Sequence, residues 1–273
     1  MYLCYHGETG GPFSLSEDIT AAAAAGFAGL EIAGRKLERY LQKYGAGGLK
    51  QALDLHGLRV PAIDYVAVDL NRDEPLEGAL RTVREYGPVA QALACDTLLL
   101  VVLGRRPELE PEAARNYLAK LMLPLCAAAR GYGLRLALEF LGRDPVLPAP
   151  AEALEVVTIS RQDNLGLSWD MFHSWKSAVP LAALRAIPIE RLYVVHAADA
   201  PAGDPAMLSD ADRVLPGSGR APLAEYFRVL LELGYDGPVS VEVPNPDLWH
   251  EGPEAAAQAA FASLQALVPM PAR

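Results

Sequence analysis

The stretch "GYGLRLALEF" at residues 131–140 contains the signals that decide the fold. It follows a helix-type stretch, and its glycines mark a position where helices typically end. The residues "RLALEF" that come next are apolar almost without interruption, as expected for a parallel strand that is covered on both faces. Glu139 stands near the end of this run. The stretch therefore predicts a helix end and then a buried strand that finishes with a carboxylate.

The same succession of helix, glycine and strand repeats along the chain. Glycine separates the two kinds of segment again in "AAGFAGLEI", "LHGLRV" and "LGYDGPVSV". Eight strand-type runs are present: "YLCY" from residue 2, "GLEIA" from 29, "RVPAIDYVAV" from 59, "DTLLLVVL" from 96, "RLALEF" from 135, "NLGLSWD" from 164, "RLYVVHA" from 191 and "PVSVEV" from 238. Helix-type stretches lie between them, for example at 14–27, 76–93, 111–133 and 222–237, and a last one covers 252–267.

Eight units of strand followed by helix in 273 residues indicate the fold class. They match a TIM barrel, which typically has about 250 residues, better than a doubly wound sheet with about five or six strands. The chain contains no linker or low-complexity stretch, and about half of its residues are hydrophobic, enough for one large core. We therefore predict an α/β protein with a single (β/α)8 TIM barrel domain.

Composition excludes several classes of partner. The formal net charge is -10 and no Lys/Arg-rich run is present, so nucleic acid is not expected to bind. The N-terminus "MYLCYHGETG" lacks the features of a signal peptide, and the apolar run "TLLLVVLG" is far shorter than the roughly 20 residues that span a bilayer. Cys4, Cys95 and Cys126 form no CxxC pair and read as buried free thiols. We expect a cytoplasmic protein without a membrane partner.

Polar residues end four successive strand-type runs. Glu139, Asp170, His196 and Glu242 close the fifth to the eighth run. Active sites of TIM barrels lie at the carboxyl ends of the strands, where these neighbours would converge. A buried carboxylate is costly unless it is paired or binds a metal. The set predicts a site for one divalent cation, in which oxygen ligands favour Mn²⁺ or Mg²⁺ and the imidazole leaves Zn²⁺ and Co²⁺ open. For each of the four residues taken alone, the alternative is a buried side chain paired with an arginine or a backbone amide.

The order of these four residues, with "DMFH" supplying Asp-x-x-His, resembles the xylose isomerase-like TIM barrels of the sugar phosphate isomerase/epimerase superfamily. The resemblance covers nearly the whole chain and implies one domain over residues 1–273. Within the superfamily, "LALEFLG", "RQDNLGLSWDMFHSW" and "SDADRVLPGSG" are similar to the inosose (2-keto-myo-inositol) isomerases. Ketose 3-epimerases carry a second Glu shortly after the first metal ligand, where this chain has Pro145, which argues against an epimerase. The five histidines are too few for the endonuclease branch.

This resemblance implies a divalent-metal-dependent isomerase of a small keto-polyol or sugar, with 2-keto-myo-inositol favoured, that transfers a proton through a metal-bound enediolate. It implies one metal ion, Mn²⁺ or Zn²⁺ with Co²⁺ or Mg²⁺ as alternatives, held by Glu139, Asp170, His196 and Glu242. Glu139 and Glu242 would also be the catalytic acid and base. Another sugar or sugar-phosphate isomerase or epimerase, a dehydratase, and a barrel that binds a polyol without converting it remain alternatives. Whether the chain forms a homo-oligomer is left open.

Two further residues are expected to bind substrate. His173 follows Asp170 by one short turn and should face the same end of the barrel. Arg213 lies in the long segment after the seventh run, where it would hold substrate oxygens; its alternative is an anchoring pair with Asp210 or Asp212.

Weaker signals carry two interpretations each. "PGSG" at 216–219 predicts either a phosphate cradle or a tight turn. Four aromatic residues predict either an apolar wall beside the site or ordinary packing: Trp169, Phe172, Trp175 and Trp249. Four residues near the ends of the first three runs are expected across the barrel from the metal, as contacts to substrate hydroxyls or as supporting hydrogen-bond partners: His6, Glu31, Arg35 and Asp64.

Overall fold

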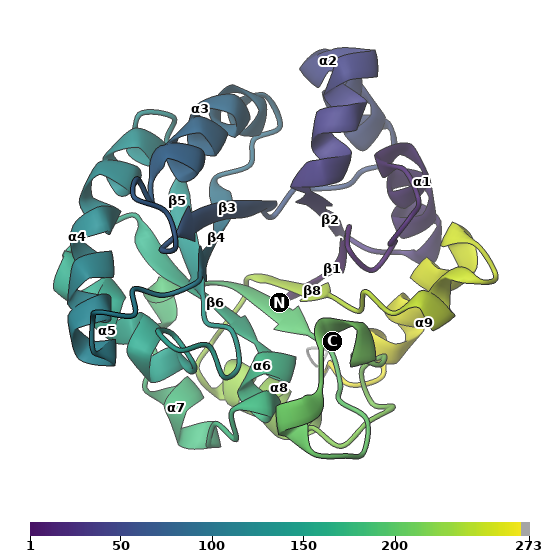
Figure 1. Cartoon of the computed structure of the whole chain (residues 1–273). Helices are drawn as coiled ribbons and strands as arrows, with labels where there is room; N and C mark the ends of the chain where they lie inside the picture. The colour runs from purple at the N-terminus through teal and green to yellow at the C-terminus, as the bar shows by residue number, and fades with distance from the viewer. Residues whose placement is uncertain (269–273) are drawn as a thin grey trace.

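Eight parallel strands pair in chain order, and the last one pairs with the first to close a barrel (Figure 1). The computed structural model describes residues 1–268. The strands are β1 (Tyr2–His6), β2 (Gly29–Ala33), β3 (Ile63–Asp69), β4 (Thr97–Leu103), β5 (Arg135–Glu139), β6 (Leu165–Asp170), β7 (Leu192–Ala197) and β8 (Pro238–Val241). Each coincides with one of the eight predicted runs, and β1 and β3 extend one residue beyond theirs, to His6 and Asp69. The predicted (β/α)8 TIM barrel is confirmed, while the predicted domain limit at residue 273 falls outside the described residues.

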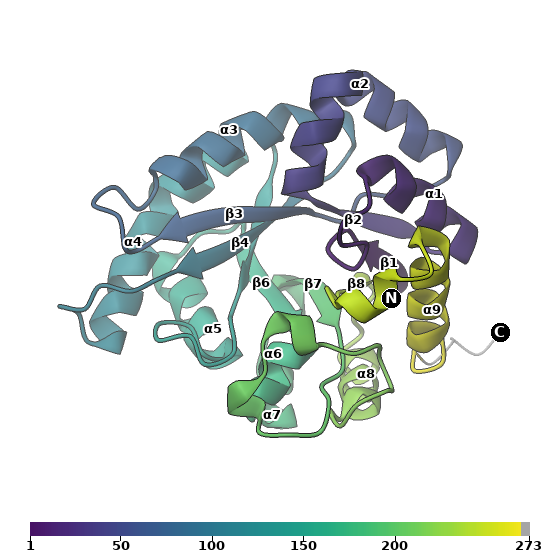
Figure 2. The same cartoon turned by 45° about the vertical axis from the view of Figure 1, so that its right-hand side comes forward.

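Helices surround the barrel (Figures 1 and 2). They are α1 (Leu15–Ala25), α2 (Gly34–Leu55), α3 (Glu77–Ala92), α4 (Pro111–Arg130), α5 (Pro150–Ser160), α6 (Met171–Lys176), α7 (Leu181–Arg185), α8 (Leu223–Glu232) and α9 (Pro253–Gln265). Short 3-10 turns are η1 (Ile189–Arg191), η2 (Pro205–Met207), η3 (Asp210–Asp212) and η4 (Pro246–Trp249). The last predicted helix, α9, closes the outer ring, because it lies against α1 (Figure 2). Every helix in the described part of the chain falls short of what a membrane span requires.

The predicted helix ends depend on glycine. Gly26 follows α1 with a φ of 101°, and Gly133 precedes β5 with a φ of 72°. Residues other than glycine adopt such positive values at a steric cost. The left-handed residue reverses the chain so that the next strand can return beneath its helix. The succession read in "GYGLRLALEF" is therefore confirmed.

Side chains fill the interior of the barrel away from the site. Leu99, Ala137 and Tyr193 belong to a small buried cluster separate from the main core. Neighbouring positions such as Leu98 and Leu100 belong instead to the main core that includes the surrounding helices. This alternation follows from the two-residue period of a strand. Because the interior is packed, polar strand residues can gather only at the carboxyl ends, which form the mouth of the barrel.

A buried ion pair supports one side of the mouth. Lys36 at the start of α2 donates to Asp18 on α1 at 2.6 Å, and both side chains are almost fully buried. Gly10 packs directly on the pair, since a Cβ at this position would come within 2.0 Å of Asp18 Oδ1. The pair therefore joins two helices to the segment that leads from β1 to α1.

We predict that Asp18→Asn lowers the free energy of unfolding by about 3–5 kcal/mol, because the Lys36 ammonium would stay buried without its counter-charge. Urea unfolding measures this change. Asp54→Asn is the matched control, because the pair of Lys50 and Asp54 is exposed and its loss should change the free energy by no more than about 0.5 kcal/mol. Equal effects of the two variants would contradict the role given to the buried pair.

Candidate metal centre

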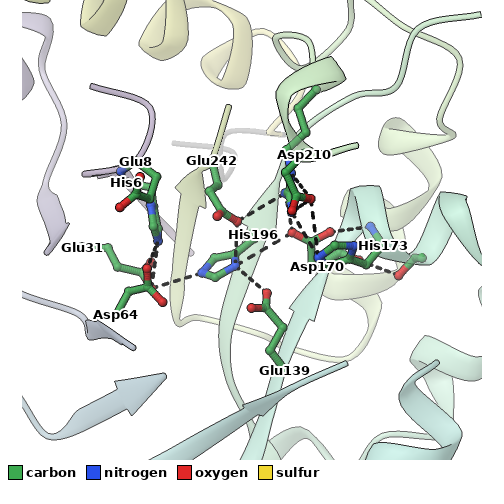
Figure 3. Close-up of polar contacts among 12 residues, drawn as sticks. His6, Glu8, Glu31, Asp64, Glu139, Asp170, His173, His196, Asp210 and Glu242 are labelled. Carbon is green, nitrogen blue, oxygen red and sulfur yellow. Dashed lines mark hydrogen bonds and ion pairs between the residues drawn. The ribbon is translucent and has the colours of Figure 1, made fainter. Parts of the chain in front are cut away.

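The four residues predicted to bind metal meet at the mouth of the barrel (Figure 3). Glu139 ends β5, Asp170 ends β6, His196 lies in β7 and Glu242 follows β8. One ligand atom from each lies within 4.8 Å of the others. In the strand register Asp170 pairs with His196, while Glu139 and Glu242 are each displaced by two residues from these partners, so all four keep the same strand face and point into the barrel. The geometry therefore allows all four to contact a single ion.

His196 lies at the centre of the cluster. Its Nδ1 is 2.8 Å from Glu139 Oε1, 3.2 Å from Glu242 Oε2 and 3.9 Å from Asp170 Oδ2. Its Nε2 is 3.1 Å from Oε1 of Glu31, a fully buried β2 residue. In the absence of an ion, Nε2–H donates to Glu31 and Nδ1–H to Glu139; with an ion bound, the proton on Nε2 would remain and the Nδ1 lone pair would be free for the metal. An imidazole held in this way is typical of metal-binding histidines.

The charges of the cluster shift the pKa values of its members. Burial raises the pKa of Glu139 to about 7, although His196 partly opposes the change. Burial would also raise the pKa of Glu242, but Arg213 and nearby histidines outweigh it and hold that pKa well below its usual range. The pKa of His196 lies well above its ordinary value, because Glu31, Glu139 and Glu242 outweigh the effect of burial. Positive charge is therefore strongly favoured at this position.

Arg213 contacts the cluster directly. Only 2% of its side chain is exposed, and Nη1 donates to Asp170 Oδ2 at 2.6 Å and to Glu242 Oε2 at 3.3 Å. Nη2 donates to Asp210 Oδ1 at 3.2 Å, and the guanidinium lies over the ring of Phe172. Arg213 therefore lies at the mouth of the barrel, as predicted, and also forms the ion pair with Asp210 considered as its alternative.

The other anchoring partner considered for Arg213 has a different contact. Asp212 accepts hydrogen bonds from the backbone and hydroxyl of Ser209, both at 2.7 Å. This closes the first turn of η3 in the manner of a capping box. A pair of Arg213 with Asp212 is therefore not formed in the described structure.

His173 faces the same mouth, as the sequence predicts. It lies in the first turn of α6, and its backbone N–H donates to Asp170 Oδ1 at 2.5 Å. Its Nε2 is 3.3 Å from Nη2 of Arg213. Asp170 therefore caps the helix that carries His173 and also contacts Arg213, so one carboxylate orders both predicted substrate contacts.

The donor set suits a divalent cation. Three carboxylates and one imidazole are ligands that Mn²⁺, Zn²⁺ and related ions accept. With Glu31 the largely buried site holds four carboxylates, of which Asp170 and Glu242 pair with the permanent cation Arg213 and Glu31 and Glu139 contact His196. A bound divalent ion would compensate the excess negative charge. The arrangement therefore fits a metal on grounds of both ligand chemistry and charge.

The predicted position across the barrel from the metal is wrong for His6 and Glu31. Glu31 is instead the supporting hydrogen-bond partner considered as the alternative. In the described part of the chain, Asp64 contacts His6 and none of the four strand-end residues. The His6 ring lies 5.1 Å from the His196 ring, and its Nε2 is 3.7 Å from Glu31 Oε1 and 3.9 Å from Asp64 Oδ2. Closure of β1 onto β8 brings these residues beside the cluster. The signal for Glu31 was present, because it is the single carboxylate inside the apolar run "GLEIA".

The prediction that Trp169 forms an apolar wall beside the site is also wrong. This side chain is fully buried and packs edge to face against Phe140 and Tyr226. It directly precedes Asp170 in β6, and successive strand residues point to opposite faces. When Asp170 points into the mouth, Trp169 must point toward the helices.

The phosphate cradle considered for "PGSG" is wrong because a carboxylate of the chain uses its amides. The backbone N–H groups of Gly217 and Gly219 donate to Asp199 Oδ2 at 3.0 and 2.9 Å. Asp199 is itself buried. The tetrapeptide is therefore a turn around an internal anion.

A cavity of about 430 Å³ lies on the side of β3, between α2 and α3. None of the four strand-end residues lines it, and Asp64, which also faces His6, is its link to the mouth. Two of its three guanidinium groups are paired, Arg35 with Glu8 at 2.7 Å and Arg72 with an aspartate at 3.0 Å. The cavity is polar, and half of its charged side chains form ion pairs with one another.

Comparisons with known proteins agree with this site. An inosose isomerase from Halalkalibacterium halodurans is 28% identical over 95% of this chain and 94% of its own length. A 3-dehydroshikimate dehydratase from Pseudomonas aeruginosa is 31% identical over 85% of this chain and 36% of its own length. A crystal structure of the IOLI protein with a zinc atom has a TM-score of 0.91 and 25% identity, with 98% of both chains covered.

The inosose isomerases confirm the predicted enzyme class, isomerase. A family model described as xylose isomerase-like TIM barrel matches residues 19–267. This match covers most of the chain and includes all four strand-end residues of the cluster. The chain belongs to the xylose isomerase-like TIM barrel family.

Proposed function

We propose that this protein is a divalent-metal-dependent isomerase of a small keto-polyol, with 2-keto-myo-inositol as the favoured substrate. The observation that carries the proposal is the convergence of Glu139, Asp170, His196 and Glu242 within 4.8 Å at the mouth of the barrel. The inosose isomerase that matches nearly the full chain supports the substrate. The zinc in the IOLI structure supports Zn²⁺ as the ion, with Mn²⁺ as the alternative that the oxygen ligands favour.

The four residues of the cluster would hold the ion. When bound, the ion would polarise a ketone oxygen and the neighbouring hydroxyl and so acidify the C–H bond between them. Glu139 and Glu242 approach His196 from either side, each through one carboxylate oxygen. The second oxygen of each carboxylate can accept a proton from the substrate. Isomerisation needs one of the two to remove a proton from one carbon and return it to the next.

His173 and Arg213 would orient the substrate. Arg213 carries a permanent charge next to both Asp170 and Glu242, so it can stabilise negative charge that develops on a substrate oxygen. Burial and the neighbouring Arg213 favour the neutral form of His173, whose pKa lies below its ordinary value. A neutral imidazole can both donate and accept a hydrogen bond. The pair therefore suits a ligand with several hydroxyl groups.

The surroundings of the cluster favour an uncharged substrate. The amides of "PGSG" and the guanidinium of Arg35 already have carboxylate partners, so neither offers a phosphate site. The cavity of about 430 Å³ beside Asp64 lies within the usual size range of small-molecule pockets, about 300–1,000 Å³, and opens on the β3 side of the mouth rather than on the cluster itself. A ring with several hydroxyl groups matches both properties. A dehydratase is the second candidate, since the Pseudomonas aeruginosa relative has that name.

The reaction can be identified by NMR of 2-keto-myo-inositol incubated with the protein in deuterated buffer. We expect a second ketone to appear with deuterium on carbon, because a base that exchanges with solvent carries the proton between carbons. Loss of water would instead identify a dehydratase. An unchanged substrate in the presence of Mn²⁺, Co²⁺ or Zn²⁺ would exclude this keto-polyol.

The acid and base roles can be tested by substitution. Glu139→Gln and Glu242→Gln should each reduce kcat by roughly 10²–10⁴-fold or more, because an amide cannot carry the proton. His173→Ala should mainly raise KM and retain the metal. His250→Ala is the control, since this imidazole is exposed and should change neither constant. Loss of bound metal in His173→Ala, measured by elemental analysis, would assign His173 to the metal rather than to the substrate.

Glu31 should support the metal through His196. We predict that Glu31→Gln weakens Zn²⁺ binding by about 10–100-fold, because the uncharged amide holds the His196 N–H less strongly. Competition with a chromogenic chelator measures the Kd without any activity assay. Glu225→Gln on the exposed side of α8 is the control. The same Kd for Glu31→Gln and the control would show that Glu31 does not support the metal.

A further inference from the structure

The segment between β7 and α8 folds around one buried carboxylate. Asp199 lies two residues after β7, and 2% of it is exposed. Its Oδ2 accepts hydrogen bonds from the backbone of Gly217 at 3.0 Å and Gly219 at 2.9 Å. Its Oδ1 accepts from the backbone of Ala221 at 2.9 Å and of Ala200 at 2.8 Å. Four backbone amides from both ends of the segment therefore share one side chain.

The backbone of Asp199 holds the middle of the same segment. Its N–H donates to Val214 O at 2.9 Å, and its C=O accepts from Val214 N–H at 3.0 Å. Val214 directly follows Arg213. From the opposite side, Asn245 Nδ2 donates to the carbonyl of Arg213 at 2.9 Å. The backbone of Arg213 is thus held in place by its own bond to Asn245 and by the two bonds between Asp199 and the next residue, Val214.

The close approach at Asp199 depends on Gly219. A Cβ at this position would lie 2.4 Å from Asp199 Oδ1 and 2.2 Å from Ala200 O. Both are far below an ordinary van der Waals contact, and the second atom belongs to the backbone. An alanine here must therefore push the segment away from the carboxylate. A substitution at Gly219 therefore disturbs the contact between Asp199 and the segment without changing Asp199 itself.

We propose that Asp199 is a positioning residue for Arg213. Its carboxylate and backbone hold the β7–α8 segment in the conformation that presents the guanidinium to Asp170 and Glu242 at the mouth. Within residues 1–268 the carboxylate of Asp199 bonds to backbone amides of this segment and to none of the four strand-end residues, so its effect on substrate is indirect. The kinetic consequence rests on the proposed function, whereas the conformational consequence does not.

Asp199→Asn is the most informative variant. It keeps the shape of the side chain, but in either orientation of the amide the NH₂ group faces two of the four backbone N–H donors. We expect trypsin to cleave after Arg213 or Arg220 about tenfold faster, because the segment opens more often. We expect KM for 2-keto-myo-inositol to rise about tenfold or more while the Kd for Zn²⁺ stays unchanged, since Arg213 is displaced and the strand-end residues are not.

Asp204→Asn is the matched control in the same segment. Asp204 is exposed and accepts one local hydrogen bond, from the backbone of Ala206 at 2.9 Å. Its variant should leave the cleavage rate and KM unchanged. Gly219→Ala should reproduce the effects of Asp199→Asn by an independent route, which keeps the proposal testable if Asp199→Asn fails to fold.

A double variant separates positioning from general stability. If Asp199 acts through Arg213, Asp199→Asn should no longer change KM once Arg213→Ala is present. A further rise of KM in the double variant would overturn the proposal, as would normal cleavage and KM in both Asp199→Asn and Gly219→Ala. If the wild-type protein converts no keto-polyol, the proposed function fails, and the trypsin experiment still decides whether Asp199 holds the segment.

Discussion

The imidazole of His196 is bound to Glu31 through one nitrogen and faces Glu139, Asp170 and Glu242 with the other. This arrangement depends on five different strands, and none of the partners is close to His196 in the chain. The closed barrel holds the strand ends together, so little conformational entropy remains to be lost when an ion or substrate binds. The chemistry of the mouth follows from this preorganised cluster.

Negative charge in a buried space is the main cost of the cluster, and the structure compensates it from two directions. Arg213 enters from the long segment after β7 and pairs with Asp170 and Glu242. A divalent ion would compensate the remaining charge around His196. The strands supply the four residues of the candidate metal centre, whereas a loop supplies the guanidinium. This division is typical of TIM barrels, in which rigid strands carry the central groups and the loops adapt the site to a substrate.

Several reactions use this scaffold, so the fold alone does not identify the substrate. The compensated charges of Arg35 and of the "PGSG" turn favour a neutral polyol over a phosphorylated sugar. The same cluster can serve an isomerase or a dehydratase, because both begin by removing a proton next to a ketone. What differs is where the proton and the oxygen go afterwards, which depends on His173, Arg213 and the walls of the mouth rather than on the metal-binding residues.

The sequence by itself determined the barrel, its eight strands and the four strand-end residues Glu139, Asp170, His196 and Glu242. These are local properties, because continuous apolar runs, glycine stops and a polar residue at a run's end can be read within a few positions. Only the tertiary structure decided that Glu31 and His6 lie beside His196, since this requires β8 to close onto β1. It also decided that Asp199 occupies the amides of "PGSG", because a turn does not reveal which distant carboxylate will fill it.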